Sequence, residues 1–525
     1  MLLFLFTILF YARSYNYGFY FDDRSQVLEG KLIRSWNSVP QLFKAPVWQN
    51  VDTARSEQNV RLDTYRPFFN LSLLVDFQKG GLSSWTFHST NVILHALVGT
   101  ILFLLLTALG LSGLWSSLGA LLFLVHPIVL TPVNYVSARA DSLCALFCLS
   151  SIYALVRFES CKNVRGKVFV VAASAVFYGA SLLSKETGIL LPFILLPLVW
   201  NFDVPKRNKI AILTTMLATT IVYFVCRKHF LGASKVAADS SHLVRVAVHF
   251  PWVVMHFFRQ VAWPTLAYPL VRFYPVVANS LHLGISLLFY LFTTVVMTFM
   301  FFSRKGRAMA WPLLLCLGTL LPPMIAVVNT EVIDGHYLYL PFLGFVLCLS
   351  VSARVAKVKV SSKSPLLAAI LLVFLAVKSF YVCEDFRSEL TFYQAIVRTG
   401  RPVSIAYLNL GNSWFRAGEW NNAIDAYEAY EKRFPVTEKI LNNKGVALMN
   451  AGRLSEAEKT LLRGIALFPQ HPKNHFNLAL VYEKSNRVPD ALRQLKMALT
   501  LQPGYAEARN EISSLCGTHR KHCRH

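Results

Sequence analysis

Two adjacent carboxylates, Asp22 and Asp23, stand in the segment "NYGFYFDDRSQVLEG", shortly after the apolar run "MLLFLFTILF". The pair is unusual because only 28 of the 525 residues are acidic and the formal net charge is +24. A carboxylate at a membrane surface can act as a general base that takes a proton from an attacking hydroxyl. A carboxylate beside it can orient a substrate or raise the pKa of the base through like-charge proximity.

Further polar residues gather at other edges between apolar runs. These edges are "TYRPFFNLS", "HPIVLTPVNYVSARAD", "LSKETG" and "EVIDGHYLYLP", and their candidate site residues are Arg66, His126, Arg139, Asp141, Lys185, Glu186, His336 and Tyr337. Ionisable residues at membrane depth are expensive to bury and are usually functional. Both signs of charge at edges on one side predict a convergent site. Solvated loops, or simple Arg139–Asp141 and Lys185–Glu186 ion pairs, are the alternative.

Sugar transfer from a lipid phosphate to a hydroxyl would use such a set of groups. The acceptor oxygen must lose a proton as it attacks, so the reaction requires one carboxylate base. The phosphate ester leaves as an anion, which needs cations or hydrogen-bond donors but no acid partner. A base opposite the leaving group implies inversion at the sugar carbon.

The composition is that of a membrane protein with a soluble part. The chain is 54% hydrophobic and 15% charged, with a mean hydropathy of +0.45, whereas soluble domains carry about 25% charged residues. The basic residues lie mostly in short loops between apolar segments, which the positive-inside rule explains better than nucleic-acid binding does. The cysteine spacing contains no CxxC pair and suggests neither a zinc site nor a disulfide scaffold.

Apolar runs predict about eleven membrane spans, near 1–12, 92–111, 115–134, 141–157, 167–184, 187–201, 210–226, 281–302, 308–328, 337–353 and 365–383. The first is short for a span, which needs roughly 20 residues, so either it is tilted or the true N-terminus is missing. The segment 243–264 contains Arg245, His249, His256 and Arg259 and is predicted to be an in-plane amphipathic helix. If this segment crossed the membrane, two basic loops would lie on the same side as Asp22 and Asp23, which the positive-inside rule disfavours.

The C-terminal part contains a repeat of 34 residues, which is the tetratricopeptide (TPR) period. Its registers are Pro435, Pro469 and Pro503; Ala423, Ala457 and Ala491; Gly411, Gly445 and Ala479; and Gly418, Gly452 and Asn486. The predicted repeats cover about 402–435, 436–469 and 470–503, with a cap at 504–515. The predicted domains are a transmembrane domain at 1–384 with a first luminal loop at 13–91, a linker at 385–403, a TPR domain at 404–515 and a disordered tail at 516–525.

Asn409, Asn443 and Asn477 also recur every 34 residues, two positions before the small packing residue. An asparagine amide offers both a donor and an acceptor, so a row of them can pair with a peptide backbone of any sequence. Concave solenoid faces are usual binding surfaces, and we therefore expect these residues to contact an acceptor peptide. Surface asparagines without a ligand are the alternative.

The order of motifs resembles the transmembrane and tetratricopeptide repeat-containing O-mannosyltransferases, which are GT-C glycosyltransferases of the endoplasmic reticulum. The resemblance rests on "GFYFDD", "YRP" with "FHSTNVILH", "HPI", "SARADSL", "LLSKETG", "HYLYLPFLGF" and the C-terminal repeats, and it spans nearly the whole chain. Gly335-His336 stand where the family usually reads Glu-Arg. The expected fold is an all-α, GT-C-type bundle with one luminal in-plane helix, followed by a TPR α-solenoid.

The resemblance implies an inverting enzyme that moves mannose from dolichyl-phosphate mannose to Ser or Thr hydroxyls of secretory or membrane proteins. Asp22 or Asp23 would be the base, and Lys185, Glu186, Arg139 and His336, with the other candidates at the same edges, would bind the donor. It further implies a multi-pass protein of the endoplasmic reticulum membrane whose catalytic loop and TPRs are luminal. The sequon Asn70-Leu71-Ser72 is compatible with that side.

No tightly bound cofactor and no nucleic-acid partner are expected, while dependence on a divalent metal stays open. The main alternative is a non-catalytic membrane adaptor that binds partners through its TPRs. A transporter would place polar residues on broken helices near mid-membrane, whereas here they gather at one face.

Overall fold

The computed structural model describes residues 1–47, 64–232, 240–264, 271–272, 280–330, 332–356, 364–398 and 403–518. The chain divides into two compact units, 1–391, here called the membrane unit, and 392–525, here called the repeat unit. Within the described ranges, all regular structure is helical except one antiparallel pair of strands, β1 Val271–Arg272 and β2 Val332–Ile333. The expected all-α class is confirmed.

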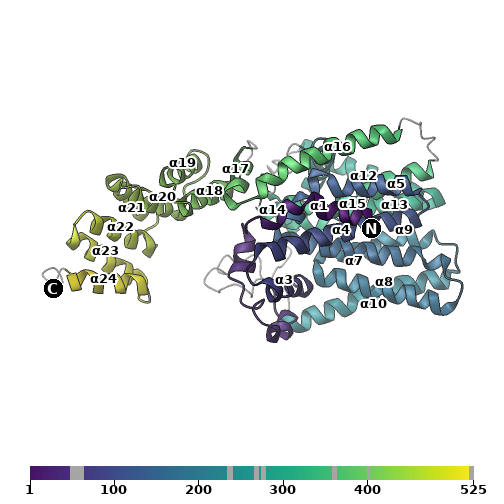
Figure 1. Ribbon diagram of the computed structural model, residues 1–525, viewed down its shortest axis with the longest axis horizontal. Helices are drawn as coiled ribbons and strands as arrows, with labels where there is room; N and C mark the ends of the chain where they lie inside the picture. The colour runs from purple at the N-terminus through teal and green to yellow at the C-terminus, as the bar shows by residue number, and fades with distance from the viewer. Residues whose placement is uncertain are drawn as a thin grey trace. The chain divides into compact units, whose positions relative to one another are not determined.

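The helices of the membrane unit pack side by side, as α4, α7, α8 and α10 show in Figure 1. They are α1 Leu2–Phe10, α2 Val39–Leu42, α3 Pro67–Gly80, α4 Ser84–Ala108, α5 Gly113–Val125, α6 Leu130–Asn134, α7 Arg139–Val156, α8 Val164–Ser184, α9 Leu191–Trp200, α10 Lys206–Leu231, α11 Ser240–Ala262, α12 Ser280–Phe302, α13 Arg304–Gly318, α14 Leu321–Thr330, α15 Tyr339–Val355 and α16 Ser364–Cys383. Short 3-10 or π turns connect them: η1 Ala12–Asn16, η2 Arg24–Leu28, η3 Trp36–Ser38, η6 Pro127–Val129, η7 Val136–Ala138, η8 Phe158–Ser160, η9 Glu186–Leu190, η10 Gly335–Leu338 and η11 Glu384–Phe386.

Seven of the described helical segments are long and apolar enough to cross a membrane, and the number is eight if a pair bent by 55° at α5 and η6–α6 counts as one span. This makes the chain a multi-pass membrane protein. About eleven spans were expected; of these, the runs at 1–12 and 187–201 form α1 of 9 residues and α9 of 10, which are shorter than a full span. The run at 308–328 is divided into α13 and α14, and Pro322 and Pro323 fall in the first turn of α14, where proline is tolerated.

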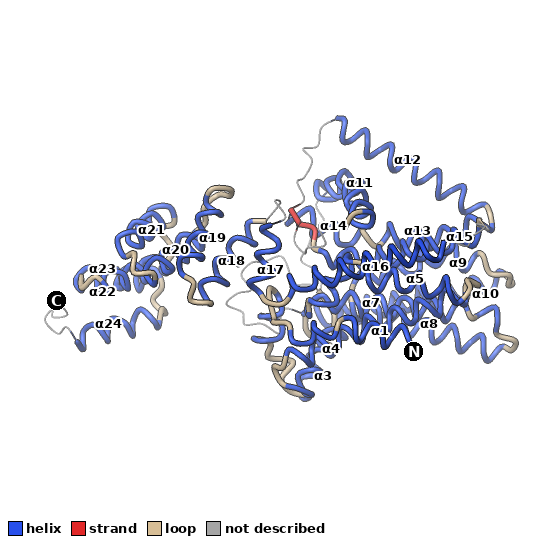
Figure 2. Tube along the Cα trace, turned by 45° about the horizontal axis from the view of Figure 1, so that its top comes forward, coloured by secondary structure: helices blue, strands red, loops and turns tan. Residues whose placement is uncertain are grey.

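α11 is amphipathic, as expected for the segment 243–264. Phe250, Val253 and Phe257 are buried against the bundle, whereas Arg245 and Arg259 are exposed. In Figure 2 this helix is seen nearly end-on, while α12 runs across the view. α11 is not among the segments that could span a membrane, and its in-plane placement stays a prediction.

α13 and α15 approach each other closely at Gly344. A Cβ atom added to this glycine would collide with the backbone of Cys316 on α13. Only glycine allows two helix backbones to lie this near. η10 leads directly into α15.

The repeat unit is a series of antiparallel helix pairs whose turns have the predicted chemistry. Its helices are α18 Ser404–Arg416, α19 Trp420–Glu431, α20 Glu438–Asn450, α21 Leu454–Leu467, α22 Pro472–Lys484, α23 Val488–Leu501 and α24 Ala506–Thr518, and α17 Glu389–Arg398 contains the boundary between the units. Gly418, Gly452 and Asn486 have φ values of +79°, +76° and +58°, as turns between TPR helices require. The expected TPR architecture is confirmed.

Some predictions concern segments that lie outside the described residues. They are the part of the first loop at 48–63, the part of the linker at 399–402 and the part of the disordered tail at 519–525. Residues 516–518, which were assigned to the tail, continue α24.

Candidate functional site

Asp23 is held by hydrogen bonds from η7, the short turn directly before α7. Its side chain is 0% exposed, and its Oδ1 accepts hydrogen bonds from the N–H (2.7 Å) and the hydroxyl (2.6 Å) of Ser137. Its Oδ2 accepts a longer bond of 3.4 Å from the N–H of Val136. Both donors belong to η7, so the carboxylate joins the first polar loop to the beginning of α7.

The residues just before Asp23 are tied to the same segment. The Tyr20 hydroxyl donates to the carbonyl of Asn134 at 2.7 Å, and the N–H of Asp22 donates to the hydroxyl of Tyr135 at 3.2 Å. Phe21, between them, has a φ of +52°. This left-handed conformation is rare for a bulky residue and persists only where surrounding contacts impose it.

The two adjacent acids differ in environment. Asp22 is half-buried, whereas Asp23 is buried. Burial raises the pKa of Asp23 from 3.8 to about 7, against the effect of the hydrogen bonds from Ser137 and Val136, and the charge of Asp22 adds a smaller rise. Near neutral pH the pair therefore carries fewer than two full charges.

A second cluster forms where the start of α7, the end of α8 and η10 meet. Lys185 Nζ lies 2.6 and 2.7 Å from the two carboxylate oxygens of Asp141, and both residues are buried. The His336 ring lies between two carboxylates, with Nε2 4.0 Å from Asp141 Oδ2 and Nδ1 2.7 Å from Asp334 Oδ1. The Nδ1 contact is short but is not aligned as a hydrogen bond.

The charges of this cluster act on one another. Burial is the largest single influence on Asp334 and acts to raise its pKa, but His336 and Lys185 contribute to lowering it below its usual value. Asp334 also accepts the backbone N–H of His336 at 3.2 Å and thereby caps η10. The His336 ring thus lies near Asp141, which also binds Lys185.

Arg66 and Glu186 extend the cluster. Arg66 precedes α3, and its Nε and Nη2 lie 2.9 and 2.8 Å from Glu186 Oε2. Glu186 opens η9, directly after Lys185, and the Lys185 ammonium lies 5.5 Å from the centre of the Tyr337 ring. The structure therefore brings together two cations, three carboxylates and two rings.

Tyr135 connects the adjacent acids to this cluster. Its ring stacks on Tyr20 with 5.5 Å between centroids. Burial raises the pKa of the Tyr135 phenol well above its usual value, and the Asp22, Asp23 and Asp334 carboxylates raise it further. Asp23 is bonded to Ser137 of η7, and Asp141, the partner of Lys185, lies in the first turn of α7 that follows, so the adjacent acids and the cluster lie at the same end of α7.

Two of the predicted donor-site residues have structural partners instead. Arg139 is 0% exposed, with Nη2 2.6 Å from Asp76 Oδ2 and Nε 2.6 Å from Asn91 Oδ1. His126 accepts the N–H of Ile128 at 3.1 Å and contacts a carbonyl of α11 at 3.2 Å. We therefore leave Arg139 and His126 out of the proposed donor site.

The partners in the expected alternative, Arg139–Asp141 and Lys185–Glu186, were also wrong. The structure pairs Arg139 with Asp76, Lys185 with Asp141, and Arg66 with Glu186. Each observed pair joins different elements, whereas each expected pair lay within a few residues of sequence. Asp76, Tyr135 and Ser137 were missed as candidates, although the last two stand inside the quoted segment "HPIVLTPVNYVSARAD".

The sequon at Asn70 is inaccessible. Asn70 lies in α3 and is 1% exposed, and the Ser72 hydroxyl accepts a bond of 3.2 Å from Arg139. A glycan cannot be attached to this side chain in the folded protein. The sequon is therefore of no use as a marker of which side of the membrane this loop faces.

The asparagines of the repeat unit bond to one another and to a tyrosine. The amide nitrogen of Asn443 donates to Asn412 Oδ1 at 2.8 Å, and that of Asn477 donates to Asn442 Oδ1 at 2.6 Å. The amide of Asn409 donates to the Tyr393 hydroxyl at 2.8 Å. These amides link successive helix pairs, which is a structural role that the 34-residue spacing did not predict.

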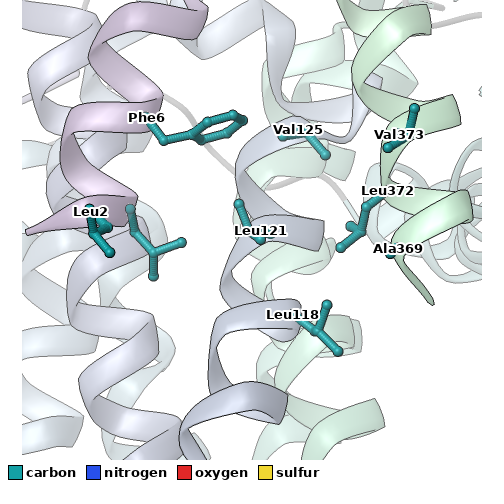
Figure 3. A pocket seen from close by; sticks show the side chains of 9 residues that line it. Leu2, Phe6, Leu118, Leu121, Val125, Ala369, Leu372 and Val373 are labelled. Atoms are coloured by element: carbon teal, nitrogen blue, oxygen red, sulfur yellow. The ribbon is translucent and has the colours of Figure 1, made fainter. Parts of the chain in front are cut away.

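A hollow of about 420 Å³ lies between α1, α5 and α16 (Figure 3). Its lining consists of Leu2, Leu3, Phe6, Leu118, Leu121, Val125, Ala369, Leu372 and Val373. Such a lining can accommodate hydrocarbon but has no group that could move a proton or hold a phosphate. Among the described residues, no group of three or more His, Cys, Asp or Glu side chains could hold a metal ion.

Comparison with known families gives matches in both units. Residues 57–231 match the family described as dolichyl-phosphate-mannose-protein mannosyltransferase, and residues 405–435 and 442–506 match tetratricopeptide repeats. The apo structure of ArnT from Cupriavidus metallidurans is 14% identical, covering 90% of this chain and 79% of ArnT, with a TM-score of 0.42. That score is too low to support an argument from structure.

Curated relatives extend the similarity to nearly the whole chain. The human protein O-mannosyl-transferase TMTC3 is 23% identical over 95% of this chain and 60% of its own length. Human TMTC4 is 31% identical over 35% of this chain and 26% of its own length. The chain thus spans about 60% of the length of TMTC3. The chain is therefore similar to the transmembrane and tetratricopeptide repeat-containing protein O-mannosyl-transferases, as its motifs indicated.

Proposed function

We propose that the chain is a membrane glycosyltransferase that moves mannose from dolichyl-phosphate mannose to Ser or Thr hydroxyls of secretory-pathway proteins. The observation that carries the proposal is that Asp23 is bonded to Ser137, just before α7, while the Lys185, Arg66 and His336 cluster forms around Asp141 in the first turn of α7. A base near several cations is what inverting transfer from a lipid phosphate requires.

In the proposed reaction, a carboxylate of the Asp22–Asp23 pair takes the proton of the acceptor hydroxyl. The hydroxyl oxygen forms a bond to the anomeric carbon, and the bond from that carbon to the phosphate oxygen breaks. Its electron pair leaves with the phosphate, which gains negative charge that Lys185, Arg66 and His336 stabilise. The attack comes from the face opposite the phosphate and inverts the configuration.

The cluster also has groups suited to a sugar. Glu186 Oε1 is shielded from solvent and has no hydrogen-bond partner among the described residues. A buried carboxylate oxygen without a donor destabilises the site, and a sugar hydroxyl would supply that donor. Asp141 and Glu186 hold Lys185 and Arg66 in place before the phosphate arrives, and Tyr337 lies against the Lys185 ammonium.

We assign the repeat unit to the acceptor polypeptide, with both the active end and the TPRs in the lumen of the endoplasmic reticulum. The amide nitrogens of Asn409, Asn443 and Asn477 are used within the unit. In this proposal the hydrogen-bonding capacity that these amides keep beyond those bonds contacts the peptide. Concave TPR surfaces of this kind commonly bind peptides.

The test is a transfer assay with the purified full chain, dolichyl-phosphate mannose and Ser- or Thr-containing acceptor peptides, with and without EDTA. We expect incorporation of mannose with inverted configuration at the anomeric carbon. Retained configuration would contradict the single-base mechanism. Binding of peptides without any turnover would favour the adaptor alternative.

A further inference from the structure

Residues 384–389, here called the border segment, lead from α16 into α17 and lie against the first polar loop. Glu384 Oε1 lies 3.0 Å from Arg13 Nη1 and accepts a hydrogen bond of 3.5 Å from the Tyr17 hydroxyl. The border segment includes η11, whose Phe386 is buried. All of these residues belong to the membrane unit. The start of the first polar loop is therefore attached to the end of α16.

Two further contacts hold this loop on either side of the two adjacent acids. Before the acids, the Gly18 N–H donates a hydrogen bond of 3.0 Å to the carbonyl of Arg387. After the acids, Arg24 Nη1 lies 3.6 Å from Glu389 Oε2. The acids therefore stand between two contacts with a segment that is far from them in sequence, and these contacts fix Glu389 opposite Arg24.

Arg24 is a cation that directly follows the two adjacent acids in the chain. Among the described residues, it forms its ion pair with Glu389. The oxygens of Asp23 accept hydrogen bonds from Ser137 and Val136 instead. A cation near a carboxyl group lowers the pKa of that group and makes it a weaker base. Because the Glu389 carboxylate offsets the Arg24 charge, the acids are spared this effect.

The other titratable groups that act on the two acids within the described part of the chain are the phenols of Tyr20 and Tyr135. Burial raises the pKa of both phenols well above the usual value, and the Asp334 carboxylate adds to the rise, so both phenols are neutral near pH 7. Substitutions at Arg24 or Glu389 leave these three groups in place. A change in the proton affinity of the acids can therefore be assigned to the Arg24–Glu389 pair.

We propose that Glu389 tunes the two adjacent acids: it offsets the charge of Arg24 and so keeps the acids basic enough to take the proton of the acceptor hydroxyl. This inference rests on the proposed sugar transfer. It holds whichever acid takes the proton, because two interacting carboxyl groups titrate as a unit. Glu389 is a positioning residue, since it acts through Arg24 and touches no reacting atom.

The experiment measures kcat against pH for the full chain and for Glu389→Gln, Arg24→Gln and the double variant. Glu389→Gln leaves the Arg24 charge uncompensated and should move the acid limb of kcat to lower pH. Arg24→Gln leaves the Glu389 charge and should move the limb to higher pH. Each shift should be about half a pH unit, because the Arg24 side chain is 39% exposed and therefore screened. The double variant removes both charges and should return the limb to its wild-type position.

Glu456→Gln is the matched control, because Glu456 also forms an ion pair, at 2.6 Å with Arg453 of the repeat unit. This substitution removes one negative charge, as Glu389→Gln does, and we expect the wild-type acid limb from it. Thermal unfolding of every variant checks that it is folded. A merely structural role of Glu389 would lower the unfolding midpoint and kcat without moving the acid limb.

Two failures can be told apart. If the wild-type chain shows no turnover under any condition, the proposed function is overturned and the role of Glu389 with it. If the wild type is active but the acid limb of Glu389→Gln is unmoved or shifts to higher pH, only the role of Glu389 is overturned. A double variant that keeps the full shift of Glu389→Gln would likewise show that Glu389 does not act through Arg24.

Discussion

At the scale of residues, the site depends on carboxylates that burial would disfavour if they had no partners. Asp23 is held by Ser137, and Asp141 by Lys185. A buried charge is tolerated only when it is paired or hydrogen-bonded. Asp23 is stabilised by hydrogen-bond donors from Ser137 and Val136, and burial raises its pKa to about 7.

The raised pKa of Asp23 predicts a specific dependence of stability on pH. A carboxyl group whose pKa rises from 3.8 to about 7 on folding contributes stability that is fully present below pH 3.8 and lost as pH rises through about 7. The contribution is at most about 4 kcal/mol, since one pKa unit corresponds to about 1.4 kcal/mol.

The measurement is the thermal unfolding midpoint of the wild type minus that of Asp23→Asn, from pH 4.5 to pH 7.5. The neutral amide does not titrate, so we expect this difference to fall as the pH rises. A difference that stays constant or increases would show that Asp23 is ionised throughout.

A second prediction separates structural pairing from donor binding at Lys185. Lys185→Gln leaves Asp141 buried without its counter-charge, which should cost about 3–5 kcal/mol of unfolding free energy. Adding Asp141→Asn removes that charge and should restore most of the stability. The double variant should still bind the lipid donor at least about tenfold more weakly, because the cation remains absent. Donor KM at the wild-type value would exclude a donor role for Lys185.

At the scale of elements, the placement of the site depends on how closely the helices approach. Gly344→Ala would force the α13 and α15 backbones apart and should destabilise the chain by about 1–3 kcal/mol. Gly284 in α12 is the matched control, because a Cβ there meets no atom within 4 Å. Thermal unfolding of the two alanine variants checks the prediction, and equal midpoints would contradict it.

Local rules predicted some elements better than others. The left-handed turns at Gly418, Gly452 and Asn486 follow from the 34-residue spacing, because each repeat uses the same turn. The division of the apolar run 308–328 into α13 and α14 was not predicted, because an apolar run does not reveal where a helix ends. The sequence alone did not predict the ion-pair partners, because whether Lys185 pairs with Glu186 or with Asp141 depends on which helix ends pack together.

At the scale of the whole molecule, the repeat unit should set acceptor affinity and leave the donor site unchanged. Asn443→Leu removes an amide that we assign to the acceptor peptide and should raise acceptor-peptide KM about fivefold at constant donor KM, since a net hydrogen bond is worth about 1 kcal/mol. Asn450→Leu is the control, because Asn450 is exposed and donates only to Val446 of its own helix. Parallel changes in both KM values would contradict separate roles for the two units.

The central claim is tested most directly by the rate of mannose transfer from dolichyl-phosphate mannose to an acceptor peptide, comparing the purified full chain with its Asp22→Ala/Asp23→Ala variant. We predict turnover by the wild type and a loss of at least about 100-fold in the double variant, with peptide binding by the repeat unit retained. No turnover by the wild type in any condition, or equal rates from both proteins, would contradict the account.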